Sequence, residues 1–577
     1  MIGGRGTRAP LHHVRKDRRP GGTTHRRRVD RTGIRVIDCS ASVLKAGLAV
    51  ATVLFAPVAL AEVPPPTAPV PAADGEPRDR PTRHLDIMEY QVQGNTLLSV
   101  IEIEEAVYPH LGPDRTADDV EAARAALEAA YSAKGYVTVV ATIPPQDPKS
   151  EVITLQVIER PVGRLRVRGS RYFSLQKIKE QAPSVAEGKV PNIDKLSDDV
   201  VDLNLIPDRR VTPELKTGAA PGTVDVDLKV EDEFPLHGSL EINNRKSADT
   251  EPLRLVTSLR YDNLWQRGDS ISFSYQTAPQ RTDDSQVWSG SYLARIPDSR
   301  VSALVYGLRS KSDVASVGDV NVIGDGEIVG GRALWPFSIE AGFVQSLSAG
   351  MDYKHFGEDT VFGEDVTPAP ITYYPFTIGY LANWSDGDSS KTDVGANVVF
   401  TLGNMGSSSS QFRNKRQGAD PSFIYLTADG SRTQELPEQF QLAGRATSQV
   451  TGQELINNEQ YSLGGLDSVR GYLESEALGD YGIALQTELR SPPLATELDP
   501  YLNELRLLGF FDFGAAGIHR PQPEQDGSFT LGSAGIGARL KLFDHLGGTI
   551  DVAYPLFDGP ETDKGHIRTN FRAWGEF

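Results

Sequence analysis

SISFSYQ, at residues 270–276, alternates polar and apolar side chains at every step. Successive side chains of a β-strand point to opposite faces, so the isoleucine, the phenylalanine and the tyrosine share one face of this stretch. The same two-residue period recurs in GIALQTELR (482–490) and in the C-terminal IRTNFRAWGEF (567–577), where the polar face carries charged residues. These segments predict strands of a sheet with one apolar and one aqueous side.

The region from residue 235 to 577 repeats this pattern and contains no segment with a helical period. Apolar residues on one face, charged residues on the other and polar loops between the strands are typical of a transmembrane antiparallel β-barrel with a wet lumen. At about 21 residues per strand and loop, the region predicts about 16 strands. WPF (335–337) and YYPF (373–376) would place aromatic residues at the membrane interfaces. A soluble β-sandwich or β-helix, whose strands also alternate, is the alternative.

The N-terminal 61 residues differ in composition from the rest of the chain. They hold 12 of the 59 lysines and arginines, and residues 43–60 that follow the basic region are apolar. ALA at 59–61 then precedes Glu62, which predicts a secretory signal peptide at 1–61 with cleavage between Ala61 and Glu62. An N-terminal membrane anchor is the alternative, but Pro57 and the A-x-A sequence favour cleavage.

Cleavage would leave 47 basic and 74 acidic residues, a net charge of about −27, which argues against a nucleic-acid partner. The one cysteine of the sequence, Cys39, precedes the apolar segment and would be removed. A cysteine-free mature chain suits an oxidising compartment and excludes a disulfide framework.

Residues 62–83 form a proline-rich linker, and two mixed α/β units are predicted after it, at 84–160 and 161–234. The first unit has a strand at 85–94, a helix capped by Thr116 with Asp119 three residues on, and strands at 136–143 and 151–159. The second unit repeats this plan. It has a strand at 163–170, helices starting near 174 and 194, and TVDVDLKVED at 223–232, whose alternation predicts a sheet with one wet face.

GGLDSVRGY, at 464–472, is unusual for a turn between barrel strands because it combines an arginine with a valine and a tyrosine. A second motif follows, in which Phe510, Asp512 and Gly514 lie on one face of a strand. We expect that face to line the lumen, so that Asp512 can bind the guanidinium of Arg470 from a loop folded into the barrel. Asp467 could compete for Arg470 locally. Alternatively, the loop is an ordinary surface turn and Asp512 belongs to the general polar lining.

Val469, Arg470, Gly471 and Tyr472, followed by the Phe510-x-Asp512-x-Gly514 motif, resemble the paired motifs of the BamA superfamily of outer-membrane barrels. The two α/β units then resemble POTRA domains. Residues 203–232 and 235–244 are similar to TpsB transporters of two-partner secretion, the exporters of haemolysins and adhesins. The resemblance covers about 84 to 577.

This resemblance implies two POTRA domains in the periplasm and a sixteen-stranded barrel in outer-membrane lipid, working as a monomer. The partner would be an unfolded TpsA-like exoprotein with an N-terminal secretion domain, captured by the POTRA domains and exported through the barrel. The Arg470 loop would control the pore and pair with Asp512. Some members begin with a helix that plugs the pore, but the proline-rich 62–83 stretch makes such a helix doubtful here.

The alternative within the same fold is a BamA-like insertase, although insertases usually carry more POTRA units. A passive porin would need neither the α/β units nor the arginine loop. GDSI (268–271) is similar to the start of certain esterases, but its serine begins a barrel strand and no histidine completes a triad. We therefore expect a protein that is not an enzyme and that has no cofactor and no metal site.

Overall fold

The computed structural model describes residues 84–147 and 151–577, except for 298, 313, 318–319, 341, 358, 363–364, 388, 495–500 and 524. The predicted signal peptide, its cleavage site at Ala61 and Glu62, and the proline-rich 62–83 segment lie outside the described residues. None of the described helices combines the length and the apolar character needed to cross a bilayer.

The first α/β unit packs two helices, α2 (Val100–Val107) and α3 (Ala117–Ala133), against a three-stranded sheet. The sheet order is β2 (Glu89–Gln93), β5 (Val152–Ile158) and β4 (Val140–Thr142), with β2 parallel to β5. Helix α3 begins where the sequence predicts, because Thr116 and Asp119 form a capping box. Leu127 and Tyr131 of α3 are buried against the sheet.

Two details of this unit differ from the sequence prediction. The strand expected at 85–94 is divided into β1 (Leu85–Ile87) and β2, and β1 pairs with β3 (Gly112–Arg115) in a separate sheet. Helix α2 was not predicted, although Ser99 and Glu102 form its capping box. The helix is short, so its apolar period is brief and easily missed.

The second α/β unit has the sheet order β6 (Val162–Arg168), β8 (Val224–Asp232) and β7 (Arg209–Thr217), again with a parallel pair, β6 and β8. Helices α4 (Leu175–Glu180) and α5 (Ile193–Leu203) cover one face. The alternation of β8 sorts its side chains as expected: Val226 and Leu228 are in the core, whereas Asp227 pairs with Arg166 on the other face.

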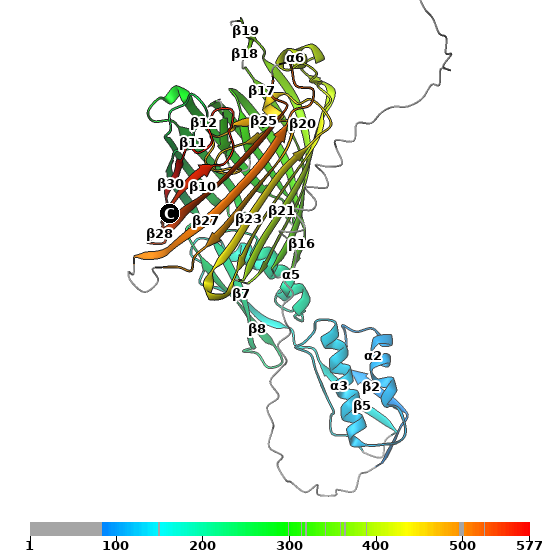
Figure 1. Ribbon diagram of the computed structural model, residues 1–577. Helices are drawn as coiled ribbons and strands as arrows, with labels where there is room; N and C mark the ends of the chain where they lie inside the picture. Colours follow the sequence, from blue (N-terminus) through cyan, green and yellow to red (C-terminus); the bar gives the residue numbers. More distant parts are fainter. Residues whose placement is uncertain are drawn as a thin grey trace, which may run out of the picture. The chain divides into compact units, whose positions relative to one another are not determined.

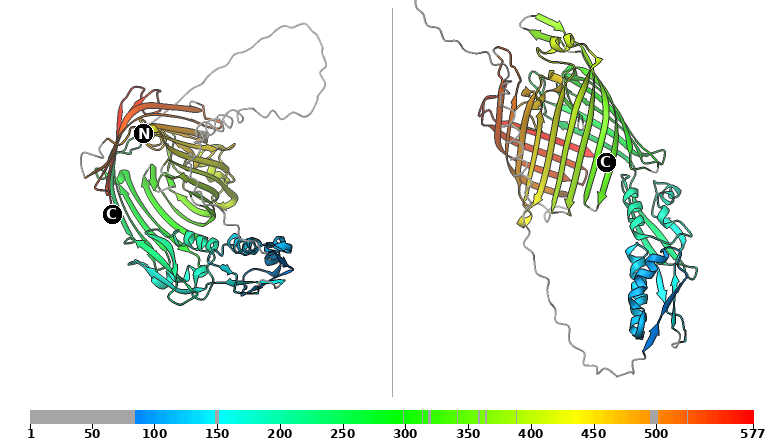
Figure 2. Two further views of the ribbon diagram at one scale, coloured as in Figure 1. Left: turned by 90° about the horizontal axis from the view of Figure 1, so that it is seen from below. Right: turned by 90° about the vertical axis from the view of Figure 1, so that its right-hand side faces the viewer.

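Sixteen antiparallel strands close into a barrel, which confirms the predicted number (Figure 1). The strands are tilted across the barrel wall (Figure 2, right). In chain order they are β9 (Leu236–Asn243), β10 (Arg254–Leu264), β11 (Asp269–Thr277), β12 (Ser285–Arg295), β13 (Ser302–Ser312), β16 (Gly326–Glu340), β17 (Phe343–Phe356), β20 (Ile371–Asp386), β21 (Ser390–Gly406), β22 (Ile424–Glu435), β23 (Gln441–Val450), β26 (Tyr481–Arg490), β27 (Leu502–Gly517), β28 (Ser528–Leu542), β29 (Leu546–Pro555) and β30 (Arg568–Glu576).

Closure comes from pairing the first barrel strand, β9, with the last, β30, from Asn243 opposite Arg572 to Ser239 opposite Glu576. Two small hairpins, β14 (Val314–Val317) with β15 (Val320–Ile323) and β18 (Asp359–Phe362) with β19 (Asp365–Pro368), extend from the loops of the same barrel end. Closing the sheet pairs the edge strands, which would otherwise expose unpaired backbone groups to lipid.

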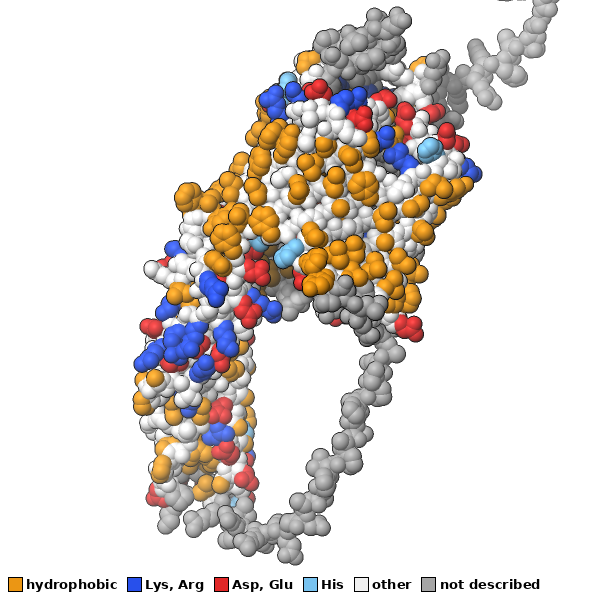
Figure 3. All heavy atoms as spheres, turned by 90° about the vertical axis from the view of Figure 1, so that its left-hand side faces the viewer, with side chains coloured by type: hydrophobic (Ala, Val, Ile, Leu, Met, Phe, Trp, Pro, Cys, Tyr) orange, Lys and Arg blue, Asp and Glu red, His pale blue; other side chains and the backbone are white. Residues whose placement is uncertain are grey.

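The barrel's outer surface is apolar, as the alternation predicts. Phe273, Leu507 and Phe511 are about half exposed, and Figure 3 shows hydrophobic side chains spread over the barrel face in view. Two expectations are wrong in detail. Tyr373 of YYPF is fully buried and does not lie at a lipid interface, and a short helix, α6 (Ser409–Lys415), occurs in the loop between β21 and β22.

Candidate functional site: a loop held inside the barrel

Residues 451–480 join β23 to β26 and fold back against the inner wall. The loop contains a hairpin of β24 (Tyr461–Leu463) and β25 (Ala477–Gly479), and GGLDSVRGY lies between these strands. The side chains of Leu463, Val469 and Tyr472 are buried together with wall residues Ala516 and Leu531. The loop tip is therefore packed against the barrel wall and is not an exposed surface turn.

Glycines allow this close packing at two motif positions. Gly471 has φ +95°, a left-handed conformation that favours glycine, and a Cβ there would lie 3.1 Å from the Cβ of Ala553. On the wall, a Cβ at Gly514 would lie 2.4 Å from Cδ1 of Leu463 and 3.1 Å from Cγ2 of Val469. A side chain at position 514 would therefore collide with the docked loop.

Arg470 binds Asp512 through two parallel hydrogen bonds. Its Nε donates to Oδ2 and its Nη2 donates to Oδ1, each at 2.7 Å, and its backbone N–H donates to Oδ2 at 3.1 Å. Arg470 is 2% exposed and Asp512 is 0% exposed. The guanidinium carbon also lies 3.7 Å from the ring centroid of Phe510. The structure thus brings Arg470, Phe510 and Asp512 into one buried contact of the bidentate, aromatic-stacked type to which arginine is suited.

Glu488 on β26 extends this contact into a larger charge cluster. Its Oε1 accepts from Nη1 of Arg470 at 2.5 Å and from Arg539 at 3.0 Å, and its Oε2 lies 2.7 Å from Nη2 of Arg490. Arg539 in turn lies 2.7 Å from Asp551. The cluster balances three arginines with three carboxylates, Asp512, Glu488 and Asp551. The sequence placed Glu488 on the polar face of its strand, but only inter-strand register selects its partners.

Tyr472 ties the loop to two further segments. Its hydroxyl oxygen lies 3.0 Å from the carbonyl oxygen of Gly532 on β28 and 2.9 Å from that of Phe557, in the loop between β29 and β30. Glu476 accepts hydrogen bonds from the backbone of Glu561 and the hydroxyl of Thr562, each at 2.9 Å. The Val-Arg-Gly-Tyr segment therefore contacts the wall through its arginine, and both the wall and the neighbouring loop through its tyrosine.

Asp467 does not compete for Arg470, contrary to the sequence expectation. It pairs with Arg245 at 2.5 Å, and Arg245 also binds Glu474 at 3.1 Å. Arg245 follows the first barrel strand, so a residue more than 200 positions away in the sequence decides the partner of Asp467.

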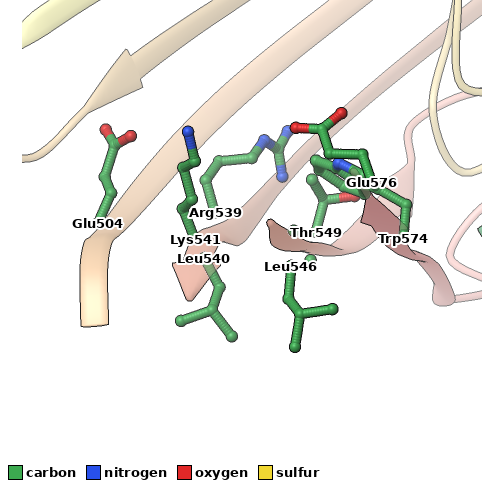
Figure 4. A pocket seen from close by; sticks show the side chains of 10 residues that line it. Glu504, Arg539, Leu540, Lys541, Leu546, Thr549, Trp574 and Glu576 are labelled. Carbon is green, nitrogen blue, oxygen red and sulfur yellow. The ribbon is translucent and has the colours of Figure 1, made fainter. Parts of the chain in front are cut away.

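A cavity of about 260 Å³ lies beside this charge cluster, which it meets at Arg539. In Figure 4 the side chains of Leu540 and Leu546 point away from the charged side chains of Lys541, Arg539 and Glu576. The cavity is also lined by Glu504, Gly547, Gly548, Thr549 and Trp574. Its charged lining continues the polar inner surface of β27 to β30.

Within the described part of the chain, one group of side chains has the proximity that a metal ion requires. The potential ligand atoms of Asp208, His237 and Asp262 lie within 4.8 Å of one another. However, Asp262 pairs with Arg260 at 2.6 Å, and Nε2 of His237 lies 2.9 Å from Asp208. Arg260 thus accounts for one of the two carboxylates, and we assign no metal to this group.

A closed sixteen-stranded barrel, an α/β domain before it and an arginine loop bound inside it define an outer-membrane barrel of the POTRA-containing class. Residues 85–160 match the family model "POTRA domain, ShlB-type". Residues 222–358 and 376–540 match the model "Haemolysin secretion/activation protein ShlB/FhaC/HecB". The chain belongs to this ShlB/FhaC/HecB family of TpsB secretion transporters.

Similar proteins include the outer membrane transporter CdiB of Dickeya dadantii, 22% identical over 75% of this chain and 76% of that protein. CdiB of Escherichia coli O6:K15:H31 is 24% identical over 81% of this chain and 78% of that protein. Among solved structures, CdiB from Escherichia coli has a TM-score of 0.64 at 19% identity, covering 93% of this chain and 97% of that one. CdiB from Acinetobacter baumannii has a TM-score of 0.58 at 14% identity with the same coverage.

The family and the barrel place this protein in the outer membrane with its POTRA domain in the periplasm. The POTRA model covers the first α/β unit. The assignment of residues 161–234 as a second POTRA domain stays a prediction, supported by the repeated order of a parallel strand pair with an antiparallel third strand.

Proposed function

We propose that this transporter captures an unfolded, TpsA-like exoprotein by its N-terminal secretion domain and exports it through the barrel, with the Val469–Tyr472 loop controlling the pore. The transporter acts as a single barrel in outer-membrane lipid. The proposal includes no catalytic step, cofactor or metal, because binding and passage of an extended chain require none.

The observation that carries the proposal is the buried Arg470 contact. A loop whose charged tip is 2% exposed and bound to three carboxylate-bearing wall strands occupies space that an extended chain needs. A set of discrete ion pairs also gives the loop two definable states, docked and released, because the pairs are either made or broken.

Capture is assigned to the α/β units at 84–160 and 161–234. Their sheets end in edge strands, and an edge strand can pair with an incoming extended segment through backbone hydrogen bonds. The first unit ends in β2 and β4, and the second ends in β6 and β7. Weak capture by such edges suits a partner that must later be released into the pore.

The test is secretion of the exoprotein from cells that express both proteins. Arg470→Ala should leave the barrel assembled, shown by its heat-dependent mobility in detergent gels, and should abolish or strongly reduce secretion. Arg520→Ala is the matched control, because Arg520 is 86% exposed in the neighbouring outer loop. Normal secretion by the Arg470 variant would refute control by this loop. A fall in the amounts of unrelated outer-membrane barrels would instead favour a BamA-like insertase.

A further inference from the structure

The two ends of the inward loop each carry a buried carboxylate outside the Arg470 cluster. Glu459 precedes the hairpin of β24 and β25, and Asp480 follows it. The side chain of Glu459 is 1% exposed and that of Asp480 is 0% exposed. A buried carboxylate is costly unless it is fully paired, so the partners of both residues define what holds the loop ends in place.

Glu459 is bound by three strands of the inner wall. Its Oε1 accepts from Nζ of Lys354 on β17 and from the hydroxyl of Tyr373 on β20, each at 2.6 Å. Its Oε2 accepts from the hydroxyl of Tyr425 on β22, also at 2.6 Å. These three donors come from different strands, so only the closed barrel assembles them around one carboxylate.

Asp480 is bound by two other outer loops. Both of its oxygens accept from the guanidinium of Arg416, which follows α6, with the Nη2 to Oδ2 distance at 2.8 Å. Its Oδ2 also accepts from the backbone N–H of His519 at 2.7 Å, and its Oδ1 accepts from that of Leu455 at 3.0 Å. Asp480 thereby joins both arms of the inward loop to the loop that carries α6 and to the loop after β27.

An apolar cluster fills the space between these two carboxylates. Phe412 of α6, Leu455 and Ile456 are almost fully buried. They pack with inward-facing residues of seven wall strands and of the segment before β22, namely Val287, Leu308, Ile328, Phe356, Ile371, Tyr373, Val399, Phe423 and Tyr425. We call α6, Arg416 and residues 452–460 the outer cap. An apolar plug of this kind within an otherwise polar lumen excludes water from the ion pairs and strengthens them.

We propose that Glu459 and Asp480 are positioning residues that latch the outer cap across the outer mouth of the barrel, and that this latch must open for export independently of the Arg470 contact. The inference rests on the proposed function of the barrel as an export channel. The latch holds the two ends of the loop, whereas Arg470 holds its tip. Release of the tip alone leaves the apolar cluster in the path of the chain.

The test is modification of a buried cysteine by a membrane-impermeant maleimide in intact cells that lack the exoprotein. The background chain carries Cys39→Ser and Ile456→Cys, so that the reactive thiol is at a position that is 1% exposed in the cap. A protected group reacts through transient opening, so the labelling rate reports the opening equilibrium. Glu459→Gln and Asp480→Asn keep side-chain shape and remove the charge.

Each substitution should speed labelling by at least about tenfold, because each weakens several charge-assisted hydrogen bonds. Glu454→Gln is the matched control, since Glu454 lies in the same segment but pairs with the exposed Arg520. Its labelling rate should stay within about twofold of the background. Rates within about twofold of the background for both latch variants would overturn the proposal.

Heat-dependent gel mobility identifies any variant whose barrel does not assemble. In that case Tyr425→Phe, which removes one donor and keeps the ring, replaces Glu459→Gln, and unchanged labelling of this variant overturns the Glu459 half of the latch. Labelling requires no exoprotein. Unchanged labelling together with lost secretion in the Arg470 variant would refute the latch and leave loop control of secretion in place. Faster labelling of the latch variants together with normal secretion by the Arg470 variant would refute loop control and leave the latch in place.

Discussion

Replacing Arg470 with alanine should release the loop tip from the barrel wall. The guanidinium makes two hydrogen bonds of 2.7 Å to Asp512 and one of 2.5 Å to Glu488, and it lies over the ring of Phe510. Breaking a buried ion pair by removing one partner costs about 3–5 kcal/mol. Loss of the aromatic contact adds about 0.5–2 kcal/mol.

Water in the lumen does little to reduce this cost at Asp512, because that side chain is 0% exposed. Glu488 retains Arg490 and Arg539 after the substitution, so its share of the loss is smaller. We therefore expect the docked loop to be destabilised by about 4 kcal/mol, which is roughly a thousandfold in the docking equilibrium. Arg470→Lys should recover only part of this, because an ammonium cannot make the planar two-bond contact.

A double-mutant cycle with Arg470→Ala and Asp512→Ala tests the pairing directly. The readout is the maleimide labelling rate of a cysteine placed at Ser468, which is buried in the docked loop. Coupled residues should give an interaction energy of about 2 kcal/mol or more. If the two single effects simply add, Arg470 and Asp512 do not interact in the membrane, and the loop must be held by its other contacts.

Four further outcomes are expected. Gly514→Ala should displace the loop and reduce secretion, because its added Cβ would collide with Leu463 and Val469. Gly509→Ala is the control, since its added Cβ meets no atom within 4 Å, and it should change neither. Equal effects of the two substitutions would contradict close packing of the loop at Gly514. Deleting 161–232 should abolish secretion and leave an assembled barrel in the membrane, and normal secretion would refute capture by that unit. Burial raises the pKa of Asp232, but hydrogen bonds from backbone N–H groups and Ser170 outweigh it and lower that pKa. Its stabilisation of an 84–234 fragment should therefore be present above about pH 4 and decline below it, and Asp232→Asn should make the acid unfolding curve less steep. Amino-terminal sequencing of the outer-membrane protein should begin near Glu62, and a soluble protein that begins at Met1 would exclude export.

The sequence by itself determined the elements that depend on local periodicity. The two-residue alternation in β11, β26 and β30 predicted which faces meet lipid and lumen, because a strand's side chains alternate whatever its neighbours are. The capping box of α3 predicted where that helix begins, because its hydrogen bonds span only three residues. The spacing of Phe510, Asp512 and Gly514 likewise placed them on one face without any knowledge of the barrel.

Only the tertiary structure decided which partners these faces meet. Glu488 pairs with Arg470 because the register of β26 and β27 sets Glu488 opposite Phe510. A shift of that register by one residue would place the Glu488 side chain on the opposite face of the sheet, away from Arg470. Tyr373 shares the inward-facing phase of β20 with Ile371 and Thr377, but YYPF is apolar at every position, so its sequence alone does not show which tyrosine faces the lumen. Asp467 with Arg245 and Glu459 with Lys354 pair across 222 and 105 residues of sequence. Closure of the barrel brings such distant groups together, and a local pattern of side chains does not predict which distant residues will meet.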